Sequence, residues 1–114
     1  MKLIGSKMEN DYRMDLVRSN EALNSDEPGI GSILRENGYN TKKAYVLHWT
    51  PDQCEDFYTV LIDGEYLVAT EIDRNTHAVL SPIERTELKD YLKGLSRTNQ
   101  VQLLVAQDLA NEKT

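Results

Sequence analysis

Two runs of β-branched and aromatic residues, 57–62 and 65–72, lie on either side of Asp63-Gly64 in the middle of the chain. An Asp-Gly pair between such runs is the sequence signature of a tight hairpin. A type I′ turn needs a positive φ at both central residues, and Asp and Gly tolerate that conformation well. The pattern therefore predicts a β-hairpin whose strands are joined by a two-residue turn.

The two-residue turn also predicts which residues of this hairpin face each other. Ile62 should pair with Glu65 and Val60 with Leu67, because the turn sets the register and paired residues share a face. The resulting faces are Tyr58, Val60, Ile62, Leu67 and Ala69 on one side, and Phe57, Leu61, Tyr66, Val68 and Ile72 on the other. Both are largely apolar, whereas a sheet with one wet side should alternate apolar and polar residues. We expect helices of this chain to cover them or, over part of one face, a partner or a second copy.

Further strands are predicted around the hairpin. Residues 43–49 predict a strand that Pro51 ends, because proline has no amide hydrogen to donate to a neighbouring strand. Residues 50–56 then form an acidic connection, residues 73–76 a second turn and residues 77–80 a short fourth strand. Alternation along the first strand places on one face Tyr45, Leu47 and Trp49. Because the strands follow one another along the chain, we expect an antiparallel meander.

Helices are predicted before the strands. Ser6 and Glu9 have the spacing of a capping box, and apolar residues recur behind them at helical intervals, which predicts a helix over residues 7–23. Residues 32–37 predict a second, short helix. Gly38 should end it, because glycine readily adopts the left-handed conformation found just after a helix.

The pattern after the strands also predicts helices. Residues 81–84 (Ser-Pro-Ile-Glu) have the order of a helix start, with a capping serine, proline at the first helical position and an acid in the first turn. An apolar stripe follows at helical spacing, formed by Leu88, Tyr91, Leu92 and Leu95. Residues 94–98 interrupt it, and residues 99–111 favour another helix, with a strand over residues 101–106 as the alternative. The predicted fold is one α+β domain, residues 1–114: an antiparallel three- or four-stranded β-meander flanked by N-terminal and C-terminal helices.

The net charge of −6 is unevenly distributed along the chain. Residues 50–90 contain ten acidic residues against three basic ones, a net charge of −7, so the acidity belongs to the turns of the sheet and to the predicted helix after it. Such a field disfavours nucleic acid, which binds clustered Lys and Arg, and favours a basic protein partner. The alternative is that these acids only keep a small domain soluble.

Cysteine content and hydropathy indicate the cellular compartment in which the protein works. Cys54 is the single cysteine, which excludes a disulfide framework and fits a reducing compartment. The N-terminus lacks the apolar run of a signal peptide, and no stretch approaches the roughly 20 apolar residues of a membrane helix. We therefore expect a cytoplasmic protein that does not associate with a membrane.

Few residues offer catalytic or ligand-binding chemistry. His48 and Cys54 form the one candidate thiolate–base pair, but the simpler explanation is a strand histidine beside a loop cysteine, because one Cys and two His occur in most chains of this size. The Gly-Ile-Gly-Ser stretch at 29–32 lacks the preceding strand and the following Lys-Ser/Thr of a phosphate loop. The acids of residues 52–56 lack the alternating Asp pattern of a calcium loop. We therefore predict no catalytic residue, no metal site and no cofactor.

Aromatic side chains lie in or beside the acidic stretch, and Trp and Tyr are enriched among residues that dominate protein interfaces. We expect Trp49 and Phe57 in the core, and Tyr58 and Tyr66 at the surface, where their hydroxyl groups meet water or a partner. The small size, acidity and absence of a catalytic signature resemble the profile of small acidic immunity proteins and antitoxins, which block basic nuclease toxins. The predicted function is non-enzymatic binding and neutralisation of a basic protein partner.

The predicted partner-binding residues are Asp52, Glu55, Asp56, Tyr58, Asp63, Tyr66 and Glu71. Two other functions remain open at this point. The doubly apolar hairpin suits a structural or regulatory subunit that self-associates, for example as a homodimer. His48 and Cys54 suit a small enzyme.

Overall fold

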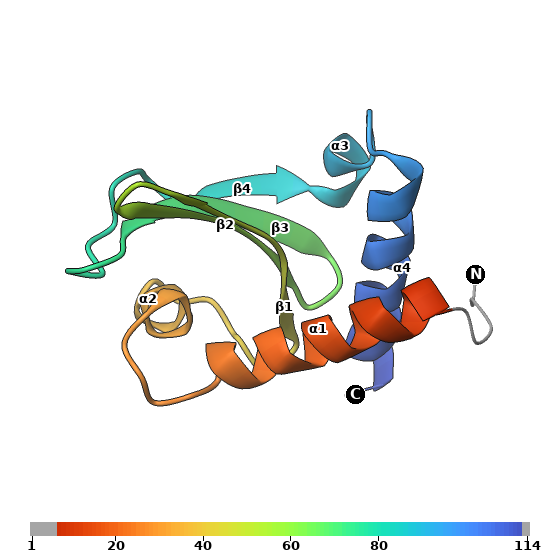
Figure 1. Ribbon diagram of the computed structural model, residues 1–114, viewed down its shortest axis with the longest axis horizontal. Helices are drawn as coiled ribbons and strands as arrows, with labels where there is room; N and C mark the ends of the chain where they lie inside the picture. The colour runs from red at the N-terminus through yellow and green to blue at the C-terminus, as the bar shows by residue number, and fades with distance from the viewer. Residues whose placement is uncertain (1–6, 113–114) are drawn as a thin grey trace.

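Two helices precede the strands and two follow them in the computed structural model, which describes residues 7–112 (Figure 1). The elements are α1 (Lys7–Leu23), α2 (Ile30–Glu36), β1 (Ala44–Asp52), β2 (Glu55–Ile62), β3 (Tyr66–Asp73), β4 (Glu84–Glu87), α3 (Leu88–Tyr91) and α4 (Arg97–Glu112). The strands form one antiparallel sheet in the order β1-β2-β3-β4. The predicted α+β meander with flanking helices is therefore confirmed.

The two N-terminal helices agree closely with the prediction. α1 has the predicted bounds, although Ser6 of the expected capping box lies outside the described residues. α2 begins two residues earlier than expected. Gly38 follows its C-cap with a φ of 88°, and the Tyr39 amide donates to the Leu34 carbonyl at 2.9 Å. This is the left-handed helix ending expected of glycine at that position.

The predicted register of the β2–β3 hairpin is wrong by one residue. Asp63 and Gly64 do have positive φ values, 56° and 70°, and the Glu65 amide donates to the Ile62 carbonyl. Glu65 nevertheless stays in the loop, and Ile62 pairs with Tyr66. A shift of one residue exchanges the faces of a whole strand. The side chains that share a face are Tyr58, Val60, Ile62, Tyr66 and Val68 on one side, and Phe57, Leu61, Leu67, Ala69 and Glu71 on the other.

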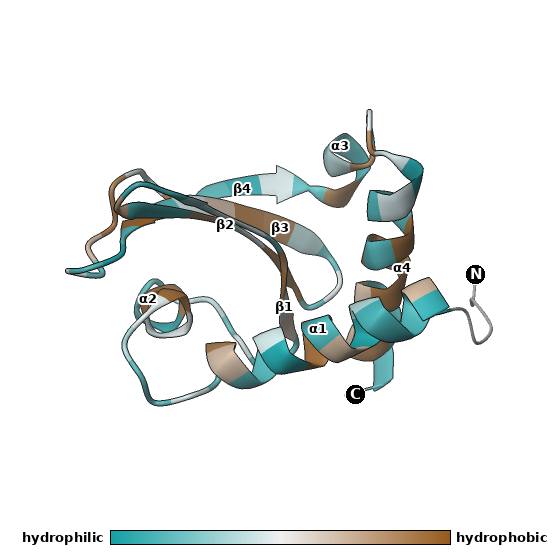
Figure 2. Cartoon of the chain, in the orientation of Figure 1, coloured by the Kyte–Doolittle hydropathy of each residue, from teal (hydrophilic) through white to brown (hydrophobic). Residues whose placement is uncertain are grey.

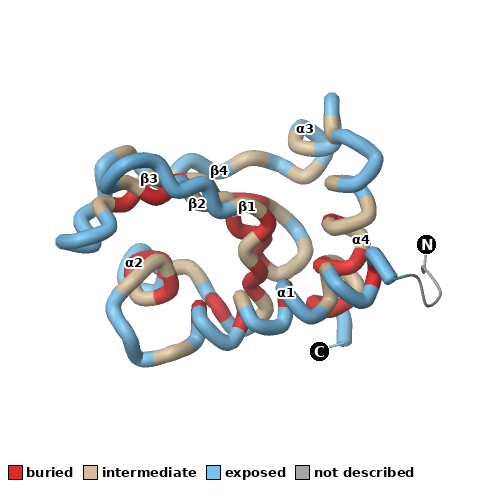
Figure 3. The backbone as a smooth tube through the Cα atoms, in the orientation of Figure 1, coloured by how far each residue is buried: buried red, intermediate tan, exposed pale blue. Residues whose placement is uncertain are grey.

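Helices of the chain cover both faces of the inner half of the sheet, as expected (Figures 1 and 3). On one face, Leu61 and Leu67 join Leu16 of α1 and Leu103 of α4 in one buried cluster. On the other face, the cluster of Val60, Ile62 and Val68 includes Leu23 of α1 and Leu34 of α2. Hydrophobic residues fill the middle of β3, residues 67–69, and its last residues are mostly hydrophilic (Figure 2).

Strand β1 does not end at Pro51 but continues to Asp52, and only Gln53 and Cys54 separate it from β2. Residues 50–56 are therefore the end of a tight hairpin rather than a long connection. Pro51 pairs with Asp56 in the ladder. β1 is an edge strand, so every second backbone N–H of β1 points away from the sheet. A proline at such a position costs the ladder no hydrogen bond.

A β-bulge at Leu47 changes the faces of β1. Val46 pairs with Val60, but His48 pairs with Thr59, so Leu47 is an extra residue in the strand. Trp49 therefore shares a face with Val46, not with Tyr45 as the alternation predicted.

The predicted fourth strand is misplaced. Residues 77–80 make only an isolated bridge, between Val79 and Ile72, whereas β4 occupies residues 84–87, where a helix start was expected. Ser81 explains the difference, because it bonds the sheet instead of capping a helix. Its Oγ accepts from the Glu71 amide at 3.1 Å, and its carbonyl accepts from the Thr70 hydroxyl at 2.9 Å.

Residues 101–106, for which a strand was the alternative prediction, are helical. Of the helix predicted after residue 81, only α3 remains, and Gly94, with a φ of 76°, lies in the predicted interruption. α4 then runs from Arg97 to Glu112, so the predicted helix over residues 99–111 is confirmed. Leu103 of this helix is buried against the sheet.

Candidate functional site

Side chains of the helices hold the outer edge of β1, but only along its first half. Asn20 of α1 donates to the Ala44 carbonyl at 2.9 Å, and the Ser19 hydroxyl accepts from the Val46 amide at 3.1 Å. Gln102 of α4 donates to the Leu47 carbonyl at 2.7 Å. Beyond Leu47, β1 and β2 extend past these anchors.

We call the projecting part of the sheet the hairpin end; it comprises residues 49–58 and the neighbouring segment 71–80. It lies at the left of Figure 1, and Figure 3 shows that most of it is exposed. Four large apolar residues there have exposed fractions of 36–57 %: Trp49, Phe57, Val79 and Leu80.

The prediction that Trp49 and Phe57 belong to the core is wrong. Trp49 is 57 % exposed and Phe57 is 36 % exposed. The ladder pairs Trp49 with Tyr58, and Phe57 with Thr50, so the two rings project from opposite faces of the hairpin. Both faces of the hairpin end are therefore partly apolar.

The tip of the hairpin carries two acidic side chains, Asp52 and Glu55, which pair in the ladder. Within residues 7–112, neither carboxylate has an ion-pair partner. Their negative charge is therefore available to an approaching cation.

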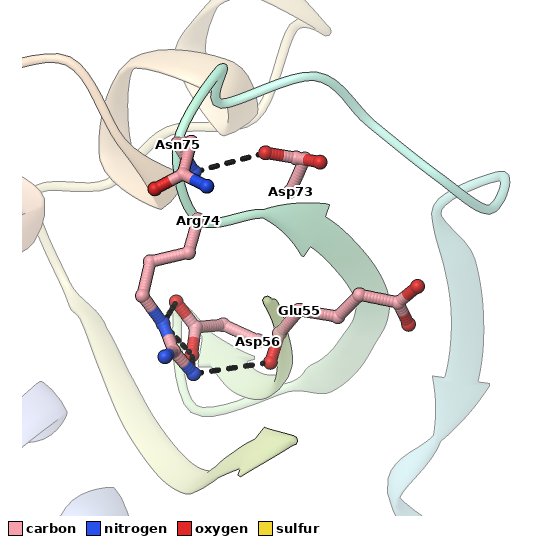
Figure 4. Close-up of polar contacts among 5 residues, drawn as sticks. All are labelled: Glu55, Asp56, Asp73, Arg74 and Asn75. Carbon is pink, nitrogen blue, oxygen red and sulfur yellow. Dashed lines mark hydrogen bonds and ion pairs between the residues drawn. The ribbon is translucent and has the colours of Figure 1, made fainter. Parts of the chain in front are cut away.

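Asp56 has a structural role instead. It is 7 % exposed, and its carboxylate accepts hydrogen bonds from Nη2 and Nε of Arg74 at 3.0 and 3.2 Å. These hydrogen bonds lower the pKa of Asp56; burial opposes that effect, and a hydrogen bond from the Trp49 side chain adds to it. Figure 4 shows Arg74 reaching the Asp56 carboxylate, whereas the Glu55 side chain extends away from it.

Arg74 also joins the two turns of the hairpin end. Its amide donates to the Cys54 carbonyl at 2.8 Å, and its guanidinium donates to the Glu55 carbonyl at 3.4 Å. In the adjoining turn, the Asp73 carboxylate accepts from the amides of Asn75 and Thr76, both at 2.9 Å. Those hydrogen bonds lower the pKa of Asp73.

The structure divides the predicted partner-binding residues between two ends of the sheet. At the hairpin end lie Asp52, Glu55, Asp56, Tyr58 and Glu71. Asp63 and Tyr66 lie at or beside the β2–β3 turn, roughly 25 Å from the Asp52–Glu55 pair and roughly 15 Å from Tyr58, along β2 at about 3.3 Å per residue. The Tyr66 ring already contacts the Tyr39 ring. The Arg85 guanidinium lies 3.8 Å from the centre of the Tyr66 ring. The seven residues do not form one patch.

A cleft of about 390 Å³ opens beside the hairpin end, between the sheet and segment 25–31. Val46, Trp49 and Tyr58 line its sheet side, and Glu27 and Ile30 line the opposite side. Burial and the Asp56 carboxylate raise the pKa of Tyr58, while Arg74 lowers it. The Tyr58 hydroxyl is therefore a neutral hydrogen-bonding group at neutral pH.

Sequence reasoning missed this cleft and the role of Arg74. The sequence pattern of residues 24–31 indicates a loop between two helices, and its Gly-Ile-Gly-Ser stretch was weighed only as a phosphate loop. The one signal in the sequence is Gly31, because a glycine permits close packing of two backbones. In the structure, Gly31 lies so close to the end of α1 that a Cβ there would meet the Leu23 carbonyl.

The thiolate–imidazole pair is not assembled. His48 lies near the ring of Tyr91, with 6.5 Å between ring centres, whereas Cys54 is exposed in the β1–β2 turn. The strand between them spans roughly 15 Å. Among the described residues, no group of three or more His, Cys, Asp or Glu side chains could hold a metal ion.

The fold and the hairpin end together define a small α+β domain with a projecting, acid-tipped β-hairpin. No family model matches the chain, and neither the curated proteins nor the solved structures contain a significant match. No helix within residues 7–112 has the length and apolar character needed to cross a membrane.

Proposed function

We propose that this protein binds a basic protein partner through the hairpin end and neutralises it without catalysing a reaction, as immunity proteins and antitoxins do. One observation carries the proposal. Exposed Trp49 and Phe57 flank a tip where the carboxylates of Asp52 and Glu55 have no ion-pair partner within the described residues.

The shape of the hairpin end favours insertion into a basic groove. Apolar side chains on both faces would contact the groove walls, and the acids at the tip would meet Lys or Arg at its base. Aromatic anchors supply most of the binding energy in such interfaces, while exposed charges mainly set the association rate and the choice of partner. The Asp56–Arg74 pair would keep the hairpin in shape before binding.

The proposal includes a cytoplasmic location. The exposed, unpaired Cys54 suits a compartment in which thiols stay reduced.

The experiment is a pull-down from native cell lysate at low and moderate salt, followed by mass spectrometry and kinetic binding measurements with the recovered protein. We expect a single basic partner that is lost as salt increases. Recovery of the bait alone at both salt concentrations, together with a mass that rises with concentration, would contradict the proposal and support self-association.

A matched pair of variants tests the site. Asp52→Lys/Glu55→Lys and Asp11→Lys/Asp15→Lys change the net charge equally, but the second pair lies on the exposed side of α1. The first variant should slow association about tenfold or more, and the second should change it little. Equal effects of the two variants would show that only net charge matters and that the hairpin end is not the site.

A further inference from the structure

The cleft beside the hairpin end has an unusual combination of aromatic walls and a single charge. Trp49 and Tyr58 form part of its sheet side, and Leu23, Ile30 and Val46 make much of the remainder apolar. Of its twelve lining residues, Glu27 is the only charged one. A ligand that fits these walls combines an apolar stem with a positively charged end.

The other charges close to the aromatic wall balance each other. Asp56 and Arg74, which both influence the Tyr58 hydroxyl, form an ion pair of 3.0 Å with each other. Asp56 and Arg74 compensate each other's charge, so Glu27 determines the sign of the charge in the cleft.

We propose that this cleft receives an arginine side chain of the basic partner. A guanidinium group stacks on Trp and Tyr rings through cation–π contact and forms paired hydrogen bonds with a carboxylate. The aliphatic stem of arginine would contact Leu23, Ile30 and Val46. The volume of about 390 Å³ is at the lower end of the range for small-molecule sites, which suits a side chain rather than a folded segment.

This inference rests on the proposed function, and Trp49 connects the two. Trp49 lines the cleft and is also exposed at the hairpin end. A partner seated over the hairpin end could therefore place one arginine in the cleft without a second contact surface.

The test uses Trp49 as a reporter, because it is the only tryptophan in the chain. Its indole N–H gives a single NMR signal, which is followed during titration of the full chain with N-acetyl-arginine amide. N-acetyl-citrulline amide is the control, since citrulline has the shape of arginine without its charge. We expect a saturable shift with the arginine compound and binding about tenfold weaker with the citrulline compound.

Two neighbouring acids provide matched variants. Glu27→Gln removes the charge that lines the cleft, and Asp26→Asn removes an adjacent exposed charge that does not line it. Glu27→Gln should weaken arginine binding about threefold to tenfold, whereas Asp26→Asn should leave it unchanged. Equal binding of arginine and citrulline, no shift of the indole signal, or equal effects of the two variants would overturn the inference.

The experiment separates this inference from the proposed function. If Glu27→Gln leaves partner binding intact while Asp52→Lys/Glu55→Lys abolishes it, the hairpin end is the site and the arginine subsite is refuted. If the arginine compound binds in a Glu27-dependent way but charge reversal at the tip leaves partner binding unchanged, the subsite stands and the proposed function fails.

Discussion

Asn20 is one of two residues, with Ser19, through which α1 holds β1, and with it one wall of the cleft. It is 5 % exposed, and its amide nitrogen donates to the carbonyls of Lys42 and Ala44 at 3.0 and 2.9 Å. Leaving a buried carbonyl without its donor costs about 1–3 kcal/mol. Asn20→Ala removes the donor from both carbonyls, and the hydrogen bond to Lys42 is only partly buried. We therefore expect the free energy of unfolding to fall by about 2–4 kcal/mol.

Urea unfolding followed by far-UV circular dichroism measures this change. For a slope of about 2 kcal/mol per M, the midpoint should fall by about 1–2 M. Asn10→Ala is the control, because Asn10 is exposed on the same helix. Its effect should stay within about 0.5 kcal/mol.

Asn20→Asp sharpens the test, because it keeps the shape but turns a donor into a carboxylate that faces two carbonyl oxygens. Burial and repulsion raise the pKa of the introduced carboxyl in the folded state. The folded state then binds the proton more tightly than the unfolded state, so the stability of this variant should increase as pH falls from 7 to 5. The reasoning is refuted if Asn20→Ala costs no more than Asn10→Ala, or if the deficit of Asn20→Asp does not shrink on acidification.

Two further predictions concern the cleft and the hairpin end. Gly31→Ala should lower the free energy of unfolding by about 1–3 kcal/mol, because the new methyl group would meet the Leu23 backbone; an unchanged urea midpoint would contradict this. Asp56 has a lowered pKa in the folded state because of Arg74, so its contribution is present above about pH 4 and is lost as pH falls through the folded pKa. Asp56→Asn should therefore be less stable than the wild type at pH 7, with a difference that shrinks below about pH 4; a difference independent of pH would show that the ion pair does not stabilise the fold.

Local patterns were sufficient for much of the fold. The bounds of α1, the ending of α2 at Gly38 and the positive φ values of Asp63 and Gly64 all follow from short-range preferences. Periodicity also identified the helix over residues 99–111. These features depend on residues a few positions apart, which the sequence places side by side.

The candidate site could be predicted only in part. The acidity of the hairpin end and the presence of aromatic residues beside it are visible in the sequence. The separation of Asp63 from Asp52, the Asp56–Arg74 pair and the contribution of Glu27 to a cleft are not, because each depends on segments that meet only in the folded chain.

The sequence by itself determined the α+β class, the order of its main elements and the acidic character of the sheet, because propensity, periodicity and charge act locally. Tertiary structure alone decided the register of β3, the bulge in β1 and the exposure of Trp49 and Phe57. One extra residue in a loop or a strand reverses every face beyond it. Whether a ring on either face is buried then depends on whether a helix lies above it, and α1 and α4 anchor β1 only as far as Leu47.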